Sequence, residues 1–272
     1  MRKLAVILSL CCLFSTFYSC KKNEEPIIEI HTTEGIIKIK LFKETPLHRD
    51  NFVKLVKEGY YDGLIFHRAM KNFLIQSGDP NSKIANHNRL LGTGGPGYTI
   101  PAEINYPKFF HKRGMLSAPR LPDNENPNKE SNGSQFCIIQ GKIFTPAELD
   151  TIEMDDYNRQ LDIVWQRLVA KKRGRIDEIS LRGNAKELKA IQDSLVIQAG
   201  KDMKKEKVFL FTPEQRKAYT TIGGAPFMDK EYTIFGEVIE GLNVVEKISL
   251  LPVDMNARPT KDVRIISAKV IN

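Results

Sequence analysis

The feature that most constrains this chain is residues 66–80, FHRAMKNFLIQSGDP, a strand-like stretch that carries one arginine and no conventional nucleophile. Arginine keeps its proton in proteins and offers five donors in a fixed geometry. Beside apolar Phe73 and the amide of Gln76, Arg68 is therefore suited to bind a neutral, carbonyl-containing ligand such as a peptide. The structural alternative is that Arg68 pairs with a carboxylate while Phe66 and Phe73 fill a core.

Further blocks in a fixed order favour the ligand-binding interpretation. They are residues 92–97 (GTGGPG), 114–118 (GMLSA) followed by 131–141 (SNGSQFCIIQG), and 223–238 (GGAPFMDKEYTIFGEV). In their order, and in the residues between the arginine and the second glutamine, these blocks resemble the cyclophilin-type peptidyl-prolyl cis-trans isomerases. The resemblance covers residues 27–141 and 221–271.

This resemblance implies a mainly β fold: a closed eight-stranded antiparallel barrel, capped by two helices, with a groove on its outer wall that binds the X-Pro segment of a peptide. The residues support it independently, because 27–32 and 36–42 are β-rich runs that alternate as a hairpin with one wet face should. Thr45-Pro46 predicts a helix start with a threonine cap and a first-turn proline. Residues 241–248 predict the second helix and 262–271 the final strand.

The resemblance also implies a set of site residues. The predicted catalytic residues are Arg68, Phe73, Gln76 and Gln135, and the predicted substrate-binding residues are Phe66, His67, Leu74, Pro119, Arg120, Cys137, Phe227, Met228 and Tyr232. Arg68 would donate toward the prolyl nitrogen and favour the twisted amide without a covalent intermediate. Accelerated rotation of X-Pro bonds is the expected activity.

Four positions depart from the best-studied pattern of the family. Cys137 stands where a large aromatic is usual, Phe227 replaces a tryptophan, Tyr232 replaces a histidine and Pro119 replaces an alanine. The small Cys137 side chain implies a wider proline pocket with weaker apolar contact. Two hypotheses therefore remain: a prolyl isomerase, and a weakly active or inactive peptide-binding chaperone module.

The N-terminus predicts export. Arg2 and Lys3 precede an apolar run over residues 4–18, too short for a membrane-spanning helix and typical of a signal peptide at 1–19. Ser19-Cys20 resembles a bacterial lipobox, which implies that Cys20 is lipidated and that residues 20–26 form a polar tether. We expect a monomer that is anchored to the bacterial cell envelope, on the periplasmic side or at the cell surface. Proline-containing unfolded or exported polypeptides are the expected partners. The alternative is ordinary secretion with a free cysteine.

The isomerase domain, predicted over 27–272, is interrupted by a charged, helical insert at 142–220. A capping box begins at Thr145 with Pro146 in the first helical turn, and apolar residues recur at helical spacing. The basic residues between Arg167 and Arg175 are flanked by acids and have no accompanying aromatic platform for bases, so they indicate a solvated face and no nucleic-acid partner. A client-docking face remains open.

Several other chemistries have little support in the sequence. The five histidines show no metal-binding spacing, so neither metal nor cofactor is expected. Residues 92–97 lack the Lys-Ser/Thr of a phosphate-binding loop and predict a surface turn beside the groove. Cys137 lies in an apolar strand and is interpreted as a buried small hydrophobe rather than a nucleophile. The net charge of +8 indicates solubility.

Overall fold

The computed structural model describes residues 25–84, 86 and 89–271. The predicted signal peptide at 1–19, Cys20 and most of the tether at 20–26 lie outside the described residues. Two compact units divide the chain, one formed by residues up to Ile143 and from Thr221 onward, the other by Phe144–Thr220. In the described part of the chain, no helix combines the length and the apolar character needed to cross a membrane.

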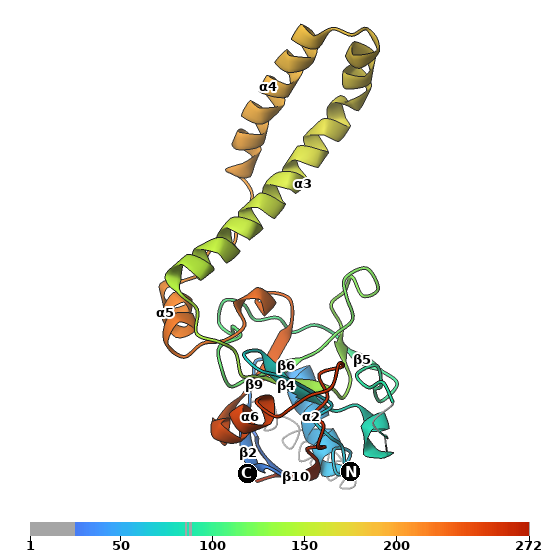
Figure 1. The fold of residues 1–272 in the computed structure, drawn as a ribbon, viewed down its shortest axis with the longest axis vertical. Coiled ribbons are helices and arrows are strands. Elements are labelled where there is room, and N and C mark those ends of the chain that lie inside the picture. Colours follow the sequence, from blue (N-terminus) through green and yellow to red (C-terminus); the bar gives the residue numbers. More distant parts are fainter. Residues whose placement is uncertain (1–24, 85, 87–88, 272) are drawn as a thin grey trace, which may run out of the picture. The chain divides into compact units, whose positions relative to one another are not determined.

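The first unit is built on one curled, antiparallel sheet of eight strands in the order β10-β1-β2-β9-β6-β8-β4-β3 (Figure 1). A second sheet pairs the short strands β5 and β7. The strand bounds are β1 Ile27–Thr32, β2 Gly35–Leu41, β3 Arg68–Met70, β4 Leu74–Ser77, β5 Thr99–Ile100, β6 Met115–Ala118, β7 Ser131–Asn132, β8 Phe136–Ile139, β9 Thr233–Glu240 and β10 Ile265–Val270.

The expectation of a closed barrel is wrong, because the sheet stays open between its edge strands β10 and β3. In the described residues the two edges meet through the isolated bridge Ile65↔Arg264 and a few backbone hydrogen bonds, such as Phe66 N to Val263 O at 2.9 Å. The physical reason is local. Strand β3 has only three residues, Arg68–Met70, and a turn over residues 71–73 follows it at once, so little of it is available to pair with β10.

The predicted hairpin is confirmed, with β1 and β2 paired in register from Ile27↔Lys40 to Thr32↔Gly35. Their inward residues pack into the main core with two helices, α2 (Pro46–Lys57) and α6 (Leu242–Ser249). Two short 3₁₀ turns, η2 (Pro80–Ile84) and η3 (Pro226–Met228), also belong to this unit.

Helix α2 begins at Pro46 as predicted, but its threonine does not cap it. Thr45 makes no side-chain cap hydrogen bond. Instead, the carboxylate of Glu103 accepts from the backbone N–H groups of Leu47 and His48, both at 3.0 Å. An anion at the N-terminus of a helix satisfies the open N–H groups and complements the helix dipole. The cap therefore comes from a residue more than fifty positions away.

Strands β4, β6 and β8 are buried on both faces of the sheet. Ile75, Leu116 and Ile138 face the main core, which lies inside the curl. The alternating residues on the outer face, including Leu74 and Cys137, pack instead in a second cluster with Ala225 and Met228. This explains why these strands are continuous buried runs, and it covers the outer face of the sheet with the 223–232 segment.

The second unit contains α3 (Pro146–Leu181), α4 (Ala185–Met203) and α5, which runs over Pro213–Thr221. The predicted capping box is present, with Thr145 Oγ1 accepting from Glu148 N at 3.2 Å and Glu148 Oε2 accepting from Thr145 N at 2.8 Å. The two long helices share a buried cluster of Val164, Leu168, Leu195, Ala199 and Met203.

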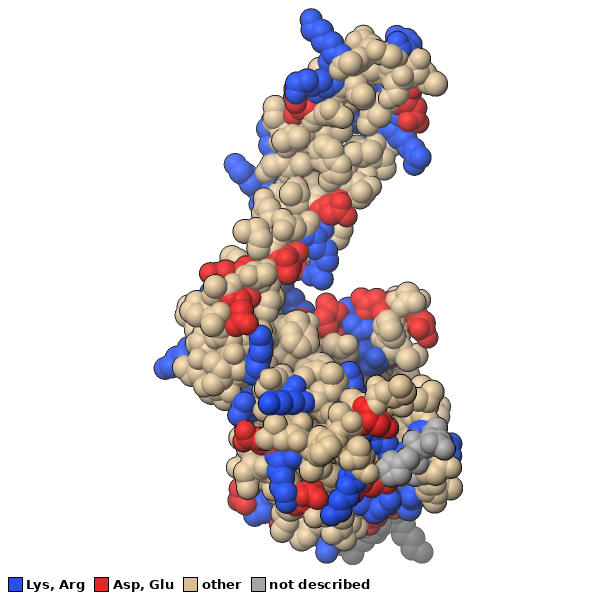
Figure 2. Space-filling model, viewed as in Figure 1, with Lys and Arg blue, Asp and Glu red and all other residues tan. Residues whose placement is uncertain are grey.

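The basic residues of α3 are partly paired. Arg167 contacts Glu206 at 2.7 Å and Arg175 contacts Glu178 at 2.9 Å. On the visible face of the molecule, cationic and anionic side chains are interspersed in this unit (Figure 2). These pairings agree with the interpretation of a solvated face.

Candidate active site

A row of side chains crosses the outer face of the sheet. The strand register places Arg68 opposite Gln76, Gln76 opposite Cys137, and Cys137 opposite Ser117. Residues directly opposite one another on antiparallel strands project from the same face. The four strands β3, β4, β8 and β6 therefore bring an arginine, a glutamine, a cysteine and a serine into one line.

The polar members of this row form a directed chain of hydrogen bonds. Arg68 Nη1 donates to Gln76 Oε1 at 3.4 Å, and Gln76 Nε2 donates to Gln135 Oε1 at 2.8 Å. Gln135 Nε2 then donates to the backbone oxygens of Gly92 and Gly94 at 3.0 and 2.6 Å. An arginine can only donate and a carbonyl can only accept. The two ends of the chain therefore fix which way both glutamine amides point.

Asp79 holds the loop that ends this chain. Its Oδ2 accepts from the N–H groups of Gly92 and Gly94 at 2.6 and 3.1 Å, and the residue is fully buried. A Cβ on Gly94 would lie 2.1 Å from Asp79 Oδ1, so only glycine fits there. Asp79 is absent from the predicted site. The signal that could have found it is its place between a strand with a site glutamine and a glycine-rich loop.

An apolar pocket adjoins Arg68. Phe73, Leu74, Cys137 and Met228 line it, and the Phe73 and Phe227 rings lie 5.3 Å apart. The Arg68 guanidinium carbon lies 5.8 Å from the centroid of the Phe73 ring. Together these residues form one side of a groove of about 730 Å³, which also includes Pro119, Arg120, Gln76, Gln135 and Tyr232.

Two predicted substrate-binding residues do not line this groove. Phe66 is fully buried in the main core, with its ring 6.1 Å from Phe136 in an edge-on contact. His67 is only 4% exposed, and neither of its ring nitrogens has a hydrogen-bond partner among the described residues. Burial lowers the pKa of His67 to about 4, so its ring is neutral near pH 7. Their positions before β3 place them in the interior.

Cys137 is a small, inert member of the row. It is 1% exposed, its Sγ donates to Ser117 O at 3.4 Å, and burial raises its pKa to about 12. A thiol with such a pKa is protonated near neutral pH and is not a nucleophile. The prediction of a buried small hydrophobe is confirmed.

Ser117 also belongs to a serine–histidine–aspartate series that has the spacing of a hydrolase triad. His111 Nε2 lies 3.1 Å from Ser117 Oγ, and His111 Nδ1 lies 3.0 Å from Asp229 Oδ1. The side chains of all three are at most 1% exposed, and Ser117 Oγ also donates to Thr233 O at 3.3 Å. A nucleophile must reach its substrate, so this buried series links β6 to the 223–232 segment that covers the outer face of the sheet, and it performs no acyl transfer.

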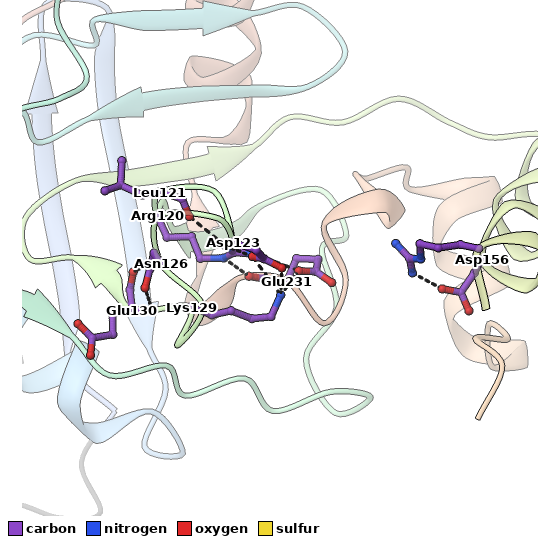
Figure 3. Close-up of polar contacts among 9 residues, drawn as sticks. Arg120, Leu121, Asp123, Asn126, Lys129, Glu130, Asp156 and Glu231 are labelled. Carbon is purple, nitrogen blue, oxygen red and sulfur yellow. Dashed lines mark hydrogen bonds and ion pairs between the residues drawn. The ribbon is translucent and has the colours of Figure 1, made fainter. Parts of the chain in front are cut away.

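The opposite wall of the groove is held by a network of charges (Figure 3). Arg120 donates to the backbone oxygen and carboxylate of Glu231 at 2.7 and 2.9 Å, and pairs with Asp123. Lys129 contacts the same two carboxylates. The Arg120 side chain is 5% exposed and lies over the Tyr232 ring, 5.0 Å from its centroid. Arg120 thus positions the wall through its side chain.

Comparison with known proteins agrees with this geometry. A family model described as cyclophilin type peptidyl-prolyl cis-trans isomerase/CLD matches residues 27–162 and 217–270. A putative peptidyl-prolyl cis-trans isomerase of Staphylococcus haemolyticus is 28% identical over 253 residues, which cover 92% of this chain and 93% of the relative. A solved cyclophilin type isomerase of Cryptosporidium parvum shares the fold, with a TM-score of 0.54, 22% identity, and coverage of 92% of this chain and 99% of that one. A second structure of that protein, determined in the presence of the dipeptide Ala-Pro, matches with a TM-score of 0.52, 22% identity, and coverage of 90% and 99%. The chain therefore belongs to the cyclophilin type peptidyl-prolyl cis-trans isomerase family.

Proposed function

We propose that this chain accelerates cis–trans rotation about X-Pro bonds, with Arg68 as the catalytic residue. The single observation that carries the proposal is the hydrogen-bonded series Arg68, Gln76 and Gln135 beside an apolar pocket on the outer face of the sheet. The pocket suits a proline ring, and the polar series suits the adjoining peptide backbone. The presence of Ala-Pro with the Cryptosporidium structure supports a proline-containing ligand for this fold.

The chemistry requires no covalent step. Amide resonance opposes rotation with a barrier of about 18–20 kcal/mol. A donor directed at the prolyl nitrogen stabilises the twisted state, in which the nitrogen lone pair is no longer delocalised. Arg68 makes only one long hydrogen bond within the described protein, at 3.4 Å to Gln76, so its other donors remain available to a substrate.

The experiment that tests this proposal is protease-coupled isomerisation of an Ala-Pro-Phe peptide by the purified chain and by Arg68→Ala and Arg68→Lys. We expect Arg68→Ala to lose nearly all turnover and Arg68→Lys to lose most, because lysine lacks the planar fork of donors. Arg182→Ala, at the end of α3 in the second unit, removes the same charge from a residue that does not line the groove and should keep full turnover. Equal turnover in all variants would contradict the proposal.

We further propose that the substrates are unfolded or exported proline-containing polypeptides. The protein would act on them as a monomer that is lipid-anchored through Cys20 at the cell envelope. The support is the sequence of residues 1–20 alone. Metabolic labelling with an alkyne-tagged fatty acid should mark the wild-type chain and not Cys20→Ser. Labelling of both, or of neither, would contradict a lipidated Cys20.

A second candidate function, a weakly active peptide-binding module, is favoured by the small side chain of Cys137 in the proline pocket. The variant Cys137→Phe discriminates between the two. A many-fold rise in turnover without a change in binding of unfolded clients would indicate a pocket that is relaxed for binding. Unchanged turnover would remove that support.

A further inference from the structure

The wall opposite the proline pocket has an unusual charge distribution. The charged residues that line the groove are Arg68, Arg120, Asp123, Glu125, Glu130 and Glu231. Arg120 and the neighbouring Lys129 both pair with Asp123 and Glu231, so these four charges cancel one another. What remains is Arg68 beside the proline pocket and two carboxylates, Glu125 and Glu130, on the loop.

Neither of these two carboxylates has an ion-pair partner among the described residues. Glu130 accepts a short hydrogen bond from the hydroxyl of Thr99, which carries no charge. Glu125 is exposed to solvent, with no side-chain contact to any described cation. The whole chain is basic, with a net charge of +8. An acidic wall in the groove is therefore opposite in sign to the molecule as a whole.

Hydrogen bonds hold Glu130 in place close to the polar series. Asn126 accepts from the Glu130 N–H at 3.0 Å and donates to its carbonyl at 2.8 Å. Two residues further on, Asn132 Oδ1 accepts from Gln135 N at 3.0 Å and Asn132 Nδ2 donates to Gly94 O at 3.1 Å. The acidic wall is thus continuous with the loop that orients Gln135.

The same wall also offers an apolar surface. Leu121, which is 56% exposed, and Pro122 line the same groove as the two carboxylates. Lysine and arginine side chains carry an apolar stem and a charged head, and they lie along apolar surface with the head directed at acids or water. An apolar strip beside two unpaired carboxylates matches both parts of such a side chain.

We propose that the groove selects peptides with a lysine or arginine next to the X-Pro pair, and that Glu125 and Glu130 determine this preference. Acidic peptides are disfavoured because they meet carboxylates that no protein cation neutralises. The inference rests on the proposed function and specifies the substrate class of the same site.

The test uses the full chain in an uncharged detergent and two series of peptides. In the first series Lys, Gln or Glu stands two residues before proline, and in the second series the same three residues stand directly after proline. Exchange NMR gives kcat/KM for each peptide without a coupling protease, and titration of the same samples gives the association constant. The readout is the Lys-to-Glu ratio, which is kcat/KM for the Lys peptide divided by kcat/KM for the Glu peptide of the same series. Because both values come from the same protein sample, this ratio does not depend on the fraction of folded molecules. The variants are Glu125→Gln with Glu130→Gln, and the control Glu246→Gln on the exposed face of α6.

At 20 mM salt we expect a Lys-to-Glu ratio of about three to ten in at least one series, as one or two partly screened ion pairs would give. The ratio should fall toward one in the double variant, and also in the wild type at 500 mM salt, while Glu246→Gln keeps it. A wild-type ratio near one, or a ratio that survives the double substitution, would overturn the proposal. A Lys preference in binding without any isomerisation would leave this inference standing and refute the proposed function.

Discussion

The side-chain amide of Gln76 donates a hydrogen bond to Gln135 Oε1 over 2.8 Å. Because Arg68 donates to Gln76, and Gln135 donates to the glycine-rich loop at 92–94, this bond connects Arg68 with that loop. Each amide has its orientation set by its neighbours, so the Arg68 end of the series is held by contacts on the far side of the groove. The geometry of Arg68, the proposed catalytic residue, therefore depends on the loop at 92–94 through the two glutamines.

The first prediction concerns the far end of this series. In Gln135→Glu, a carboxylate oxygen replaces the Nε2 that now donates to Gly92 O and Gly94 O at 3.0 and 2.6 Å. Two N–H donors are lost and a negative carboxylate faces two carbonyl oxygens, so we expect the free energy of unfolding to fall by about 2–4 kcal/mol. Urea denaturation measures this change, and kcat/KM should fall at least about tenfold. The exposed Gln166→Glu on α3 makes the same chemical change and should alter neither quantity. A stable, fully active Gln135→Glu would show that the series is not needed.

The second prediction concerns Gly94. Its substitution by alanine places a Cβ 2.1 Å from the carboxylate of Asp79, so the loop must shift away from Gln135. We expect a loss of kcat/KM together with a lower midpoint of thermal unfolding. Gly174 on α3 has open space around it, and Gly174→Ala should instead stabilise its helix by about 0.5–1 kcal/mol. If Gly94→Ala kept wild-type turnover, the loop would not position the site.

A third prediction concerns His67 and pH. Because burial lowers the pKa of His67 to about 4, from an ordinary value of 6.5, the unfolded chain binds a proton between these two pH values and the folded chain does not. Stability is therefore complete above about pH 6.5 and is lost as pH falls toward 4, by up to about 3 kcal/mol from this group.

The measurement is chemical denaturation at several pH values for the wild type and His67→Leu. The leucine variant should show a flatter dependence of stability on pH between 6.5 and 4 than the wild type. An identical slope in His67→Leu and the wild type would exclude a buried neutral His67.

The fourth prediction concerns Cys137. Because its thiol is 1% exposed and has a pKa raised to about 12, it should not react with a maleimide in the native protein at pH 8. In a chain that begins at residue 21, where Cys137 is the only cysteine, labelling should appear only with unfolding in urea. Rapid labelling under native conditions would mean that the pocket opens to solvent at this position.

The sequence predicted the hairpin of β1 and β2, the helices α2 and α6 and most of the groove, because these depend on alternation, turn residues and blocks of adjacent residues. It missed features that depend on residues far apart in the chain. Glu103 caps α2, and Arg120 is held by Glu231, 111 residues away. No local pattern reports such pairs.

The open edge between β3 and β10 was missed for a related reason. Closure of the sheet depends on how many residues each edge strand offers for pairing, and β3 has only three. Phe66 and His67 were misplaced because they adjoin Arg68 in sequence, whereas both precede β3 and have their side chains buried in the interior.

The central claim is that Arg68 catalyses rotation about X-Pro bonds, and exchange NMR of an Ala-Pro peptide tests it most directly. With catalytic amounts of the wild-type chain, we predict exchange between the cis and trans signals of the peptide on a timescale of a second or less, against tens to hundreds of seconds for the uncatalysed reaction. With Arg68→Ala, folded by circular dichroism, exchange should return close to the uncatalysed rate. Slow exchange with the folded wild type, or fast exchange with Arg68→Ala, would contradict the account.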